Sequence, residues 1–239
     1  MQQNIPFIDL GAQQRRLKSG LDAAIQGVLA HGKYIMGPEV GRLEEALATY
    51  TSVSEAVCCS NGTDALFMGL MVLDVRPGDA VFVPSFTFAA TAEVVALMGA
   101  TPVFVDVEED SYTLSLESLE AAYDLLQRQY PALRPRGVIV VDLFGRPAHY
   151  EDLESFTRRH QLFLMVDAAQ SFGARFQGKA TVTYGDLATT SFFPAKPLGG
   201  YGDGGAIFTE NTQMADALRS IRVHGMGKDV ERSSIRRHP

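Results

Sequence analysis

Residues 163–171 read Phe163-Leu164-Met165-Val166-Asp167-Ala168-Ala169-Gln170-Ser171, and this stretch decides the fold class of the chain. Its first four residues are all apolar, which is typical of a strand that is buried on both faces of a sheet. The apolar run stops at Asp167, a carboxylate that has to be paired or solvated at the end of such a strand. Strands of this kind favour a parallel sheet that is covered by helices.

Strand and helix patterns alternate on both sides of this stretch. Helices are predicted at 13–30, 39–50, 64–73, 86–98, around 119–126, at 150–160 and at 211–223, and strands at 56–59, 79–83, 102–106, 137–142, 163–166, 187–191 and 206–209. We therefore expect an α/β fold with three layers, a mostly parallel sheet with helices on both faces. The helix at 13–30 is amphipathic, and its apolar stripe consists of Leu17, Leu21, Ala24, Ile25, Val28 and Leu29.

Composition and charge exclude several classes of protein. The 239 residues are 46% hydrophobic and 21% charged, which is ordinary for a globular domain. The net charge of −7 disfavours a nucleic-acid binder, no run approaches the ~20 apolar residues of a membrane span, and the N-terminus does not resemble a signal peptide. Cys58 and Cys59 are adjacent on a predicted strand and point to opposite faces, so we expect reduced thiols in a cytoplasmic protein. The five histidines show no spacing typical of a metal site.

A lysine in an apolar loop is the first candidate for chemistry. Residues 190–200 read Thr190-Ser191-Phe192-Phe193-Pro194-Ala195-Lys196-Pro197-Leu198-Gly199-Gly200. Lys196 in such a loop can lose its proton and attack an aldehyde, whereas most lysines are exposed and unreactive. Its apolar neighbours make a poor solvent loop and argue against an exposed lysine. With Asp167 as the partner of a pyridinium nitrogen, Lys196 supplies what pyridoxal phosphate (PLP) requires of a protein.

Residues that suit the phosphate of such a cofactor follow other strands. Gly62 and Thr63 open a helix after the strand at 56–59, where free backbone N–H groups favour a phosphate. Ser191 would add a hydroxyl to the same phosphate cup. A plain helix cap made by Asn61 or Thr63 is the alternative interpretation.

The predicted contacts to the cofactor ring also have alternatives. Phe88 follows the strand at 79–83 and could lie flat on a pyridine ring, although an isolated Phe usually serves core packing. Gln170 lies three residues after Asp167 and could reach a ring hydroxyl. Asp167 itself could instead be a helix N-cap.

Seven short motifs occur in the order and with the spacing of one protein family. They are Tyr34-Ile35-Met36-Gly37-Pro38-Glu39-Val40, Asn61-Gly62-Thr63-Asp64-Ala65-Leu66, Pro84-Ser85-Phe86-Thr87-Phe88, Asp167-Ala168-Ala169-Gln170-Ser171, Ser191-Phe192-Phe193-Pro194-Ala195-Lys196, Gly202-Asp203-Gly204-Gly205 and Arg222-Val223-His224-Gly225. Over residues 5–228 the chain resembles the PLP-dependent sugar aminotransferases of the DegT/DnrJ/EryC1/StrS family, which have the fold-type-I aminotransferase architecture.

The resemblance implies a role for each candidate residue. Lys196 corresponds to the Schiff-base lysine and proton shuttle, and Asp167 to the partner of the pyridine nitrogen. The other implied cofactor contacts are the phosphate ligands Gly62, Thr63 and Ser191, the stacking ring of Phe88 and the ring-hydroxyl contact of Gln170.

The resemblance also implies an activity. Family members move an amino group from glutamate to a nucleotide-linked keto-sugar, in the biosynthesis of cell-surface polysaccharides or aminosugars. Lys196 favours transamination, because a dehydratase branch of the family carries histidine at that position. The stretch 194–205 most resembles members that act on UDP-linked 3-keto sugars. Full-length members are implied to be homodimers, and no nucleic-acid or membrane partner is expected.

The resemblance divides the chain into three segments and leaves two alternatives. We expect an N-terminal helical segment at 1–30, a large PLP-binding domain at 31–228 and an irregular tail without family likeness at 229–239. Family chains continue with an asparagine-containing loop and a small C-terminal domain, both missing here, so we expect a C-terminally truncated member. One alternative is an inactive remnant that binds PLP weakly or acts only as a partner of a full-length paralogue. The other is a different fold-type-I PLP enzyme, such as a lyase.

Overall fold

A computed structural model describes residues 8–226 of the chain, so the tail predicted at 229–239 lies outside the described residues. In chain order the elements are α1 (Leu10–His31), α2 (Pro38–Thr51), β1 (Glu55–Cys59), α3 (Gly62–Val72), β2 (Asp79–Pro84), α4 (Ala90–Leu97), β3 (Thr101–Val105), α5 (Leu116–Gln129), β4 (Arg134–Val141), η1 (Leu143–Gly145), α6 (Tyr150–His160), β5 (Phe163–Asp167), β6 (Arg175–Phe176), β7 (Lys179–Ala180), η2 (Thr181–Thr183), β8 (Leu187–Ser191), β9 (Gly205–Thr209) and α7 (Thr212–Arg222).

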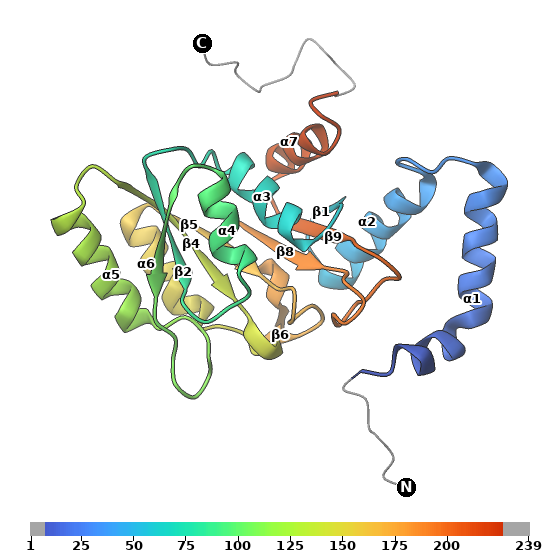
Figure 1. Ribbon diagram of the computed structural model, residues 1–239, viewed down its shortest axis with the longest axis horizontal. Helices are drawn as coiled ribbons and strands as arrows, with labels where there is room; N and C mark the ends of the chain where they lie inside the picture. The colour runs from blue at the N-terminus through green and yellow to red at the C-terminus, as the bar shows by residue number, and fades with distance from the viewer. Residues whose placement is uncertain (1–7, 227–239) are drawn as a thin grey trace, which may run out of the picture.

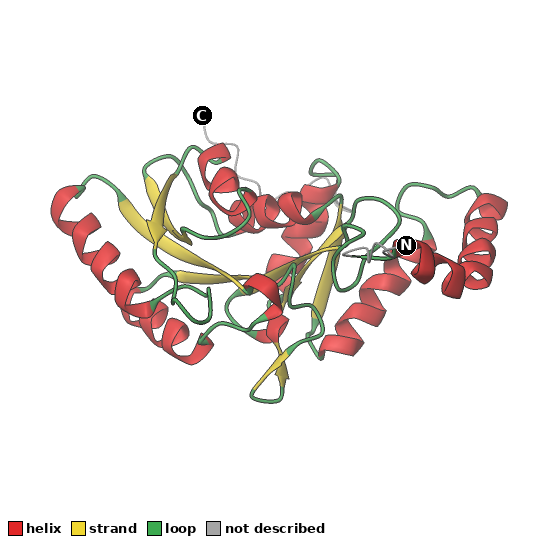
Figure 2. Ribbon diagram, turned by 60° about the horizontal axis from the view of Figure 1, so that its bottom comes forward, coloured by secondary structure: helices red, strands yellow, loops and turns green. Residues whose placement is uncertain are grey.

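Seven strands form one sheet in the order β1-β9-β8-β5-β4-β2-β3. The strands β2, β3, β4, β5 and β8 pair in parallel, whereas β9 is antiparallel to both of its neighbours, β1 and β8. Helices cover both faces of the sheet (Figure 1 and Figure 2). The predicted three-layer, mostly parallel α/β fold is therefore confirmed.

The strand at the centre of the sheet explains why the apolar run of the sequence is continuous. All five residues of β5 are buried. Leu164 and Val166 belong to the core formed with α2, α5 and α6, and Phe163 and Met165 belong to the core formed with α3, α4 and α7. A strand between two helical layers cannot carry polar side chains on either face, so polar chemistry is confined to its ends.

One local prediction was wrong, and one pair of short strands was missed. The helix predicted from residue 86 begins at Ala90, because the backbone N–H of Ser85 donates to the carbonyl of Val105 at 2.7 Å and keeps the chain extended beyond β2. The short hairpin β6–β7 was not predicted, since strands of two residues show no periodicity. Its turn uses Gln177 and Gly178, both with positive φ.

Both cysteines lie on β1 and are free thiols. Burial raises the pKa of the Cys58 thiol and of the Cys59 thiol to about 12. Few thiolates therefore form near neutral pH, and the prediction of reduced cysteines in the core agrees with their positions.

The first helix stands apart from the body of the molecule in both views (Figure 1 and Figure 2). The predicted helix at 13–30 is confirmed as α1, and it ends where Gly32 adopts φ 67°. None of its residues is buried, and Ile25 and Leu29 are each more than half exposed. The apolar stripe thus has no covering element within residues 8–226. In the same part of the chain, no helix is both long enough and apolar enough to cross a membrane.

The close contact between β4 and β5 gives a test of the core. A Cβ added at Gly137 would lie 2.3 Å from a ring carbon of Phe163, which is buried on the neighbouring strand. Gly137→Ala should lower the free energy of unfolding by roughly 1–3 kcal/mol, because the ring cannot move away freely. Gly41→Ala on α2 is the matched control, since nothing lies within 4 Å of its added Cβ. Urea unfolding that shows equal losses for both variants would contradict this packing.

Candidate functional site

The predicted site residues gather where parallel strands end. Asp167 is the last residue of β5 and Ser191 the last residue of β8. Gly62 begins α3 shortly after β1, and Phe88 follows β2. The carboxyl ends of parallel strands lie along one edge of a sheet, which is where ligands of open α/β sheets bind.

Gly62 and Ser191 are in direct contact. A Cβ added at Gly62 would lie 2.7 Å from the Cβ of Ser191 and 3.1 Å from its hydroxyl oxygen, so only glycine allows this approach. The N–H groups of the first turn of α3 have no acceptor within the helix. Asn61 caps the helix by accepting from the N–H of Asp64 at 2.7 Å. The helix cap, which the alternative interpretation assigned to Asn61 or Thr63, is therefore made by Asn61. The first turn of α3 at Gly62 and the hydroxyl of Ser191 together form a small polar cradle.

The first turn of α3 has two further polar groups. Thr63 is half-buried beside Gly62. Asp64 carries an acidic side chain, which accepts hydrogen bonds from the Ser60 hydroxyl and, at 3.0 Å, from the Asn61 amide. These donors partly compensate the negative charge of Asp64, so it opposes an anion at this helix start less than a free carboxylate would.

Asp167 is a buried carboxylate with a single backbone donor. Its Oδ1 accepts from the N–H of Ala169 at 3.0 Å, and the residues that follow form turns rather than a helix, so the helix-cap alternative is wrong. Burial raises the pKa of the Asp167 carboxyl, while the Ala169 N–H and the positive charge of Lys196 oppose that rise. A buried carboxylate of this kind favours a cationic partner such as a protonated ring nitrogen.

A hydroxyl that the sequence reasoning missed lies beside this carboxylate. Thr189 is paired in register with Asp167 on the neighbouring strand, so the two side chains leave the same face of the sheet. Its Oγ1 is buried and has no hydrogen-bond partner in the described part of the chain. The signal in the sequence was the polar run Thr189-Thr190-Ser191 at the end of an apolar strand.

Lys196 lies on the loop that follows β8. The loop turns tightly, because the N–H of Lys196 donates to the carbonyl of Phe193 at 2.8 Å and the N–H of Gly200 donates to Phe192 at 2.7 Å. Lys196 is half-buried, and among residues 8–226 its amine forms no salt bridge. The expectation that apolar neighbours bury this loop was wrong for Phe193 and Leu198, which are 51% and 41% exposed.

Aromatic side chains form the rim of the site. Phe88 is 74% exposed, so the alternative role in core packing does not apply to it. Phe86 contacts the rings of Tyr112 and Phe144 at centroid distances of 5.8 and 6.4 Å. The side-chain oxygen of Gln170 accepts from the N–H of Phe144 at 2.5 Å. Exposed apolar groups around a polar centre are typical of a binding surface.

The structure therefore brings some predicted residues into contact and leaves others at the rim. Gly62 touches Ser191. The positive charge of Lys196 lowers the pKa of Asp167, but no salt bridge joins the two side chains in the described part of the chain. Thr63 belongs to the turn that begins with Gly62. Phe88 and Gln170 lie on the same sheet edge, with no described contact to these pairs. The cradle at Gly62, the unpartnered Thr189 hydroxyl and the buried Asp167 fit the phosphate and the cationic ring of PLP.

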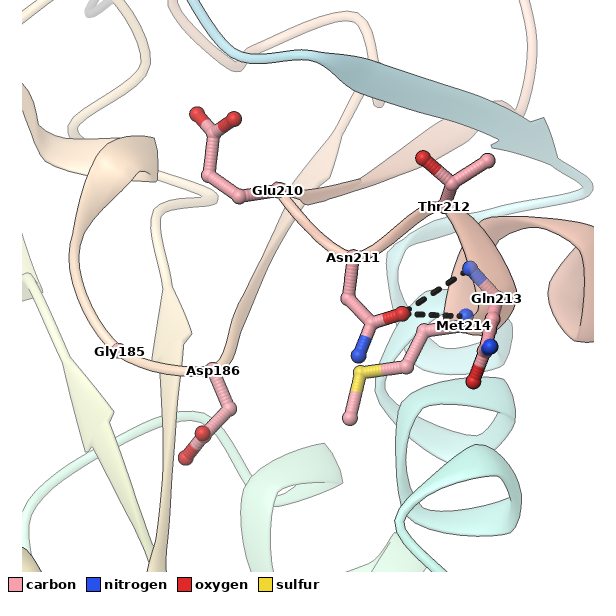
Figure 3. Close-up of a pocket in the computed structure, with 7 residues that line it drawn as sticks. All are labelled: Gly185, Asp186, Glu210, Asn211, Thr212, Gln213 and Met214. Carbon is pink, nitrogen blue, oxygen red and sulfur yellow. Dashed lines mark hydrogen bonds between the residues drawn. The ribbon is translucent and has the colours of Figure 1, made fainter.

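A hollow at the start of α7 lies where β8 begins and β9 ends (Figure 3). It is lined by Gly185, Asp186, Glu210, Asn211, Thr212, Gln213 and Met214. Asn211 accepts from the N–H groups of Gln213 and Met214 at 3.0 and 3.2 Å, and Asp186 accepts from Leu164 at 2.8 Å. These side chains already serve helix capping and strand pairing, so the hollow is not the candidate site.

Known proteins are similar to this chain in sequence and in fold. A model of the DegT/DnrJ/EryC1/StrS aminotransferase family matches residues 16–238. The UDP-2-acetamido-2-deoxy-3-oxo-D-glucuronate aminotransferase of Pseudomonas aeruginosa is 46% identical over 224 residues, which are 94% of this chain and 60% of the relative.

Solved structures agree with this match. A DegT/DnrJ/EryC1/StrS aminotransferase from Brucella abortus superimposes with a TM-score of 0.92 at 51% identity, over 95% of this chain and 60% of that one. DesV from S. venezuelae, in complex with a ketimine intermediate, superimposes with a TM-score of 0.89 at 38% identity, over 98% of this chain and 60% of that one. The chain thus spans about 60% of the length of the proteins that it matches.

The burial of the Asp167 carboxyl predicts the sign of a change in the free energy of unfolding. Its pKa is higher in the folded chain than in the unfolded one, so its ionisation lowers stability as the pH rises through the folded pKa. Asp167→Asn should therefore stabilise the cofactor-free chain at pH 8 by on the order of 1 kcal/mol, and the gain should shrink towards pH 4. Urea unfolding at both pH values measures it. Asp203→Asn, at an exposed loop position, is the control without an expected effect; a destabilised Asp167→Asn at pH 8 would contradict the assignment.

Proposed function

The chain belongs to the DegT/DnrJ/EryC1/StrS aminotransferase family, and on that premise we propose that it acts in the transfer of an amino group to a nucleotide-linked keto-sugar. Enzymes of this family depend on PLP. The observation that carries the proposal is the buried carboxylate of Asp167 at the end of β5, on the sheet edge where Gly62 meets Ser191 and where the loop of Lys196 follows β8. Bound PLP would withdraw electrons from the Cα–N bond of an amino donor.

Each residue of the site has a distinct task in this proposal. Asp167 keeps a ring nitrogen protonated, because a buried carboxylate needs a cationic partner. Lys196 would hold the cofactor through its Nζ, and the same Nζ would move a proton at the donor Cα. The remaining contacts hold the phosphate and the ring: Gly62, Thr63 and Ser191 with the N-terminus of α3, the ring of Phe88 and the amide of Gln170.

We propose glutamate as the donor and a UDP-linked 3-keto sugar as the acceptor. The name of the Pseudomonas aeruginosa relative, which is an aminotransferase of a UDP-linked 3-oxo sugar, supports this acceptor. The exchange balances: glutamate becomes 2-oxoglutarate, and the keto carbon of the sugar receives the amino group. Such a reaction belongs to the cytoplasmic biosynthesis of aminosugars or cell-surface polysaccharides.

Covalent trapping tests the role of Lys196. The chain mixed with PLP should gain a visible absorbance band, and borohydride should fix the cofactor to the peptide that contains Lys196. Lys196→Ala should abolish both signals, whereas Lys179→Ala, at an exposed position of β7, should leave them unchanged. Mass spectrometry of the reduced digest locates the label. An absorbance band that persists in Lys196→Ala would show that Lys196 is not the residue that binds PLP covalently.

The alternatives predict other outcomes in a glutamate half-reaction. Conversion of the bound cofactor, with one equivalent of 2-oxoglutarate released, supports transamination. A stable spectrum without 2-oxoglutarate would support a remnant that does not catalyse. Loss of carbon dioxide or ammonia from the amino acid would support a lyase.

We also propose that the protein forms a homodimer through α1. Most of the stability of a helix in a protein comes from the packing of its apolar face, and the apolar stripe of α1 remains uncovered within residues 8–226. A shallow apolar hollow beside the stripe is lined by Ala24, Ile25, Val28, Leu29, Tyr34 and Glu39. A second copy of the chain would cover this surface and order the helix.

Single charges on α1 test the dimer. Light scattering after gel filtration should give twice the chain mass, and Ile25→Glu should shift it to the monomer mass at micromolar concentration, because the charge would be buried in the interface. Ala23→Glu adds the same charge on the opposite, exposed side of the helix and should leave the dimer intact. A monomeric wild-type chain would contradict this interface.

A further inference from the structure

A second buried carboxylate lies next to Asp167 in the sheet. Asp142 follows β4, is fully buried, and its N–H donates to the Asp167 carbonyl at 3.1 Å. Val141 pairs with Asp167, so the side chain of Asp142 leaves the opposite face of the sheet from that of Asp167. Asp142 therefore does not face the candidate cofactor site, and nothing in the proposed reaction uses it.

Three groups from two segments of the chain, residues 148–150 and the turn at Ser171, donate to the Asp142 carboxylate. Oδ2 accepts from the hydroxyls of Tyr150 and Ser171, each at 2.5 Å, and Oδ1 accepts from the N–H of Ala148 at 3.1 Å. The Ser171 hydroxyl also lies 3.1 Å from that of Thr181. A buried carboxylate with three donors is a strong tether, because every lost bond leaves a buried polar group unpaired.

Both segments adjoin the candidate site. Ser171 lies in the turn at 169–173, which follows Asp167 and contains Gln170. Ala148 ends the loop whose Phe144 N–H donates to the Gln170 side chain. Gly145, with φ 82°, brings this loop against the Gln170 carbonyl, where an added Cβ would lie 2.9 Å from the oxygen. Asp142 thus connects the turn that contains Ser171 to the loop that contains Phe144, and the Phe144–Gln170 hydrogen bond connects the same two segments a second time.

We propose that Asp142 is a positioning residue, which holds the turn from Asp167 to Ser171 and the Phe144 loop in the geometry that the cofactor needs. This inference rests on the proposed function, because it assumes that Asp167 and Gln170 bind PLP. It deepens that proposal with a residue that touches neither cofactor nor substrate.

The charge of Asp142 is consistent with this task. Burial raises the pKa of Asp142 to about 6, the donors Ser171, Tyr150 and Ala148 oppose the rise, and the nearby charge of Asp167 adds to it. The three donors favour the ionised form of the carboxyl group, to which each of them donates in the structure.

Amide hydrogen exchange in the cofactor-free chain tests the tether directly. The reporters are the N–H of Ala169, which donates to Asp167, and the N–H of Phe144, which donates to Gln170. Asp142→Asn and Ser171→Ala should each raise exchange at both amides about tenfold relative to wild type. Heteronuclear NMR on labelled protein resolves these sites, and urea unfolding corrects for changes in global stability.

Two matched variants separate positioning from a general loss of stability. Tyr150→Phe removes a bond of the same length to the same oxygen of Asp142, but from α6, which carries no candidate site residue. Asp79→Asn changes another buried carboxylate, which pairs with Arg134 at 2.7 Å at the start of β2. Both should alter the reporter amides only as far as global stability changes. Equal exchange in all four variants would overturn the proposal.

A second measurement links the tether to the cofactor. The dissociation constant for PLP, from spectral titration, should rise about tenfold in Ser171→Ala and stay within twofold in Tyr150→Phe. If Asp142→Asn does not fold, this pair of variants still decides the question. A wild-type chain that does not bind PLP would contradict the proposed function. The exchange data on the cofactor-free chain would still show whether Asp142 holds the turn and the loop in place.

Discussion

The burial of β5 on both faces is the constraint on which the rest of the structure depends. Two layers of helices cover this strand, so its side chains must be apolar until it reaches the edge of the sheet. Asp167 stands at the first position where a carboxylate is tolerated, and even there it is buried. The candidate site therefore lies at the carboxyl ends of the strands, because the burial that stabilises the sheet excludes polar groups from the rest of each strand.

Close backbone approach is the second requirement of this edge. Gly62 lets α3 begin against Ser191, and Gly205 lets β9 start beside Asn61, where an added Cβ would lie 2.5 Å from the Asn61 carbonyl oxygen. A side chain at either position would push the helix start away from the end of β8. The cradle therefore exists because residues far apart in the chain lack side chains at the points where they meet.

The two buried carboxylates illustrate how one edge can serve structure and chemistry together. Asp142 has three donors on one face of the sheet, whereas Asp167 has one donor on the other face and the charge of Lys196 nearby. The first is satisfied by its own chain. The second is left short of partners, as expected for a group that binds a cationic ligand.

The sequence by itself determined most of the elements and indicated the candidate site residues, and only the tertiary structure decided how they meet. The bounds of β8 and α6 agree with the predicted 187–191 and 150–160, because local periodicity reports which faces are buried. The late start of α4 and the hydroxyl of Thr189 beside Asp167 depend on contacts with neighbouring strands, which no local pattern encodes. For the same reason, the antiparallel β9, the exposed stripe of α1 and the tether at Asp142 became visible only in three dimensions.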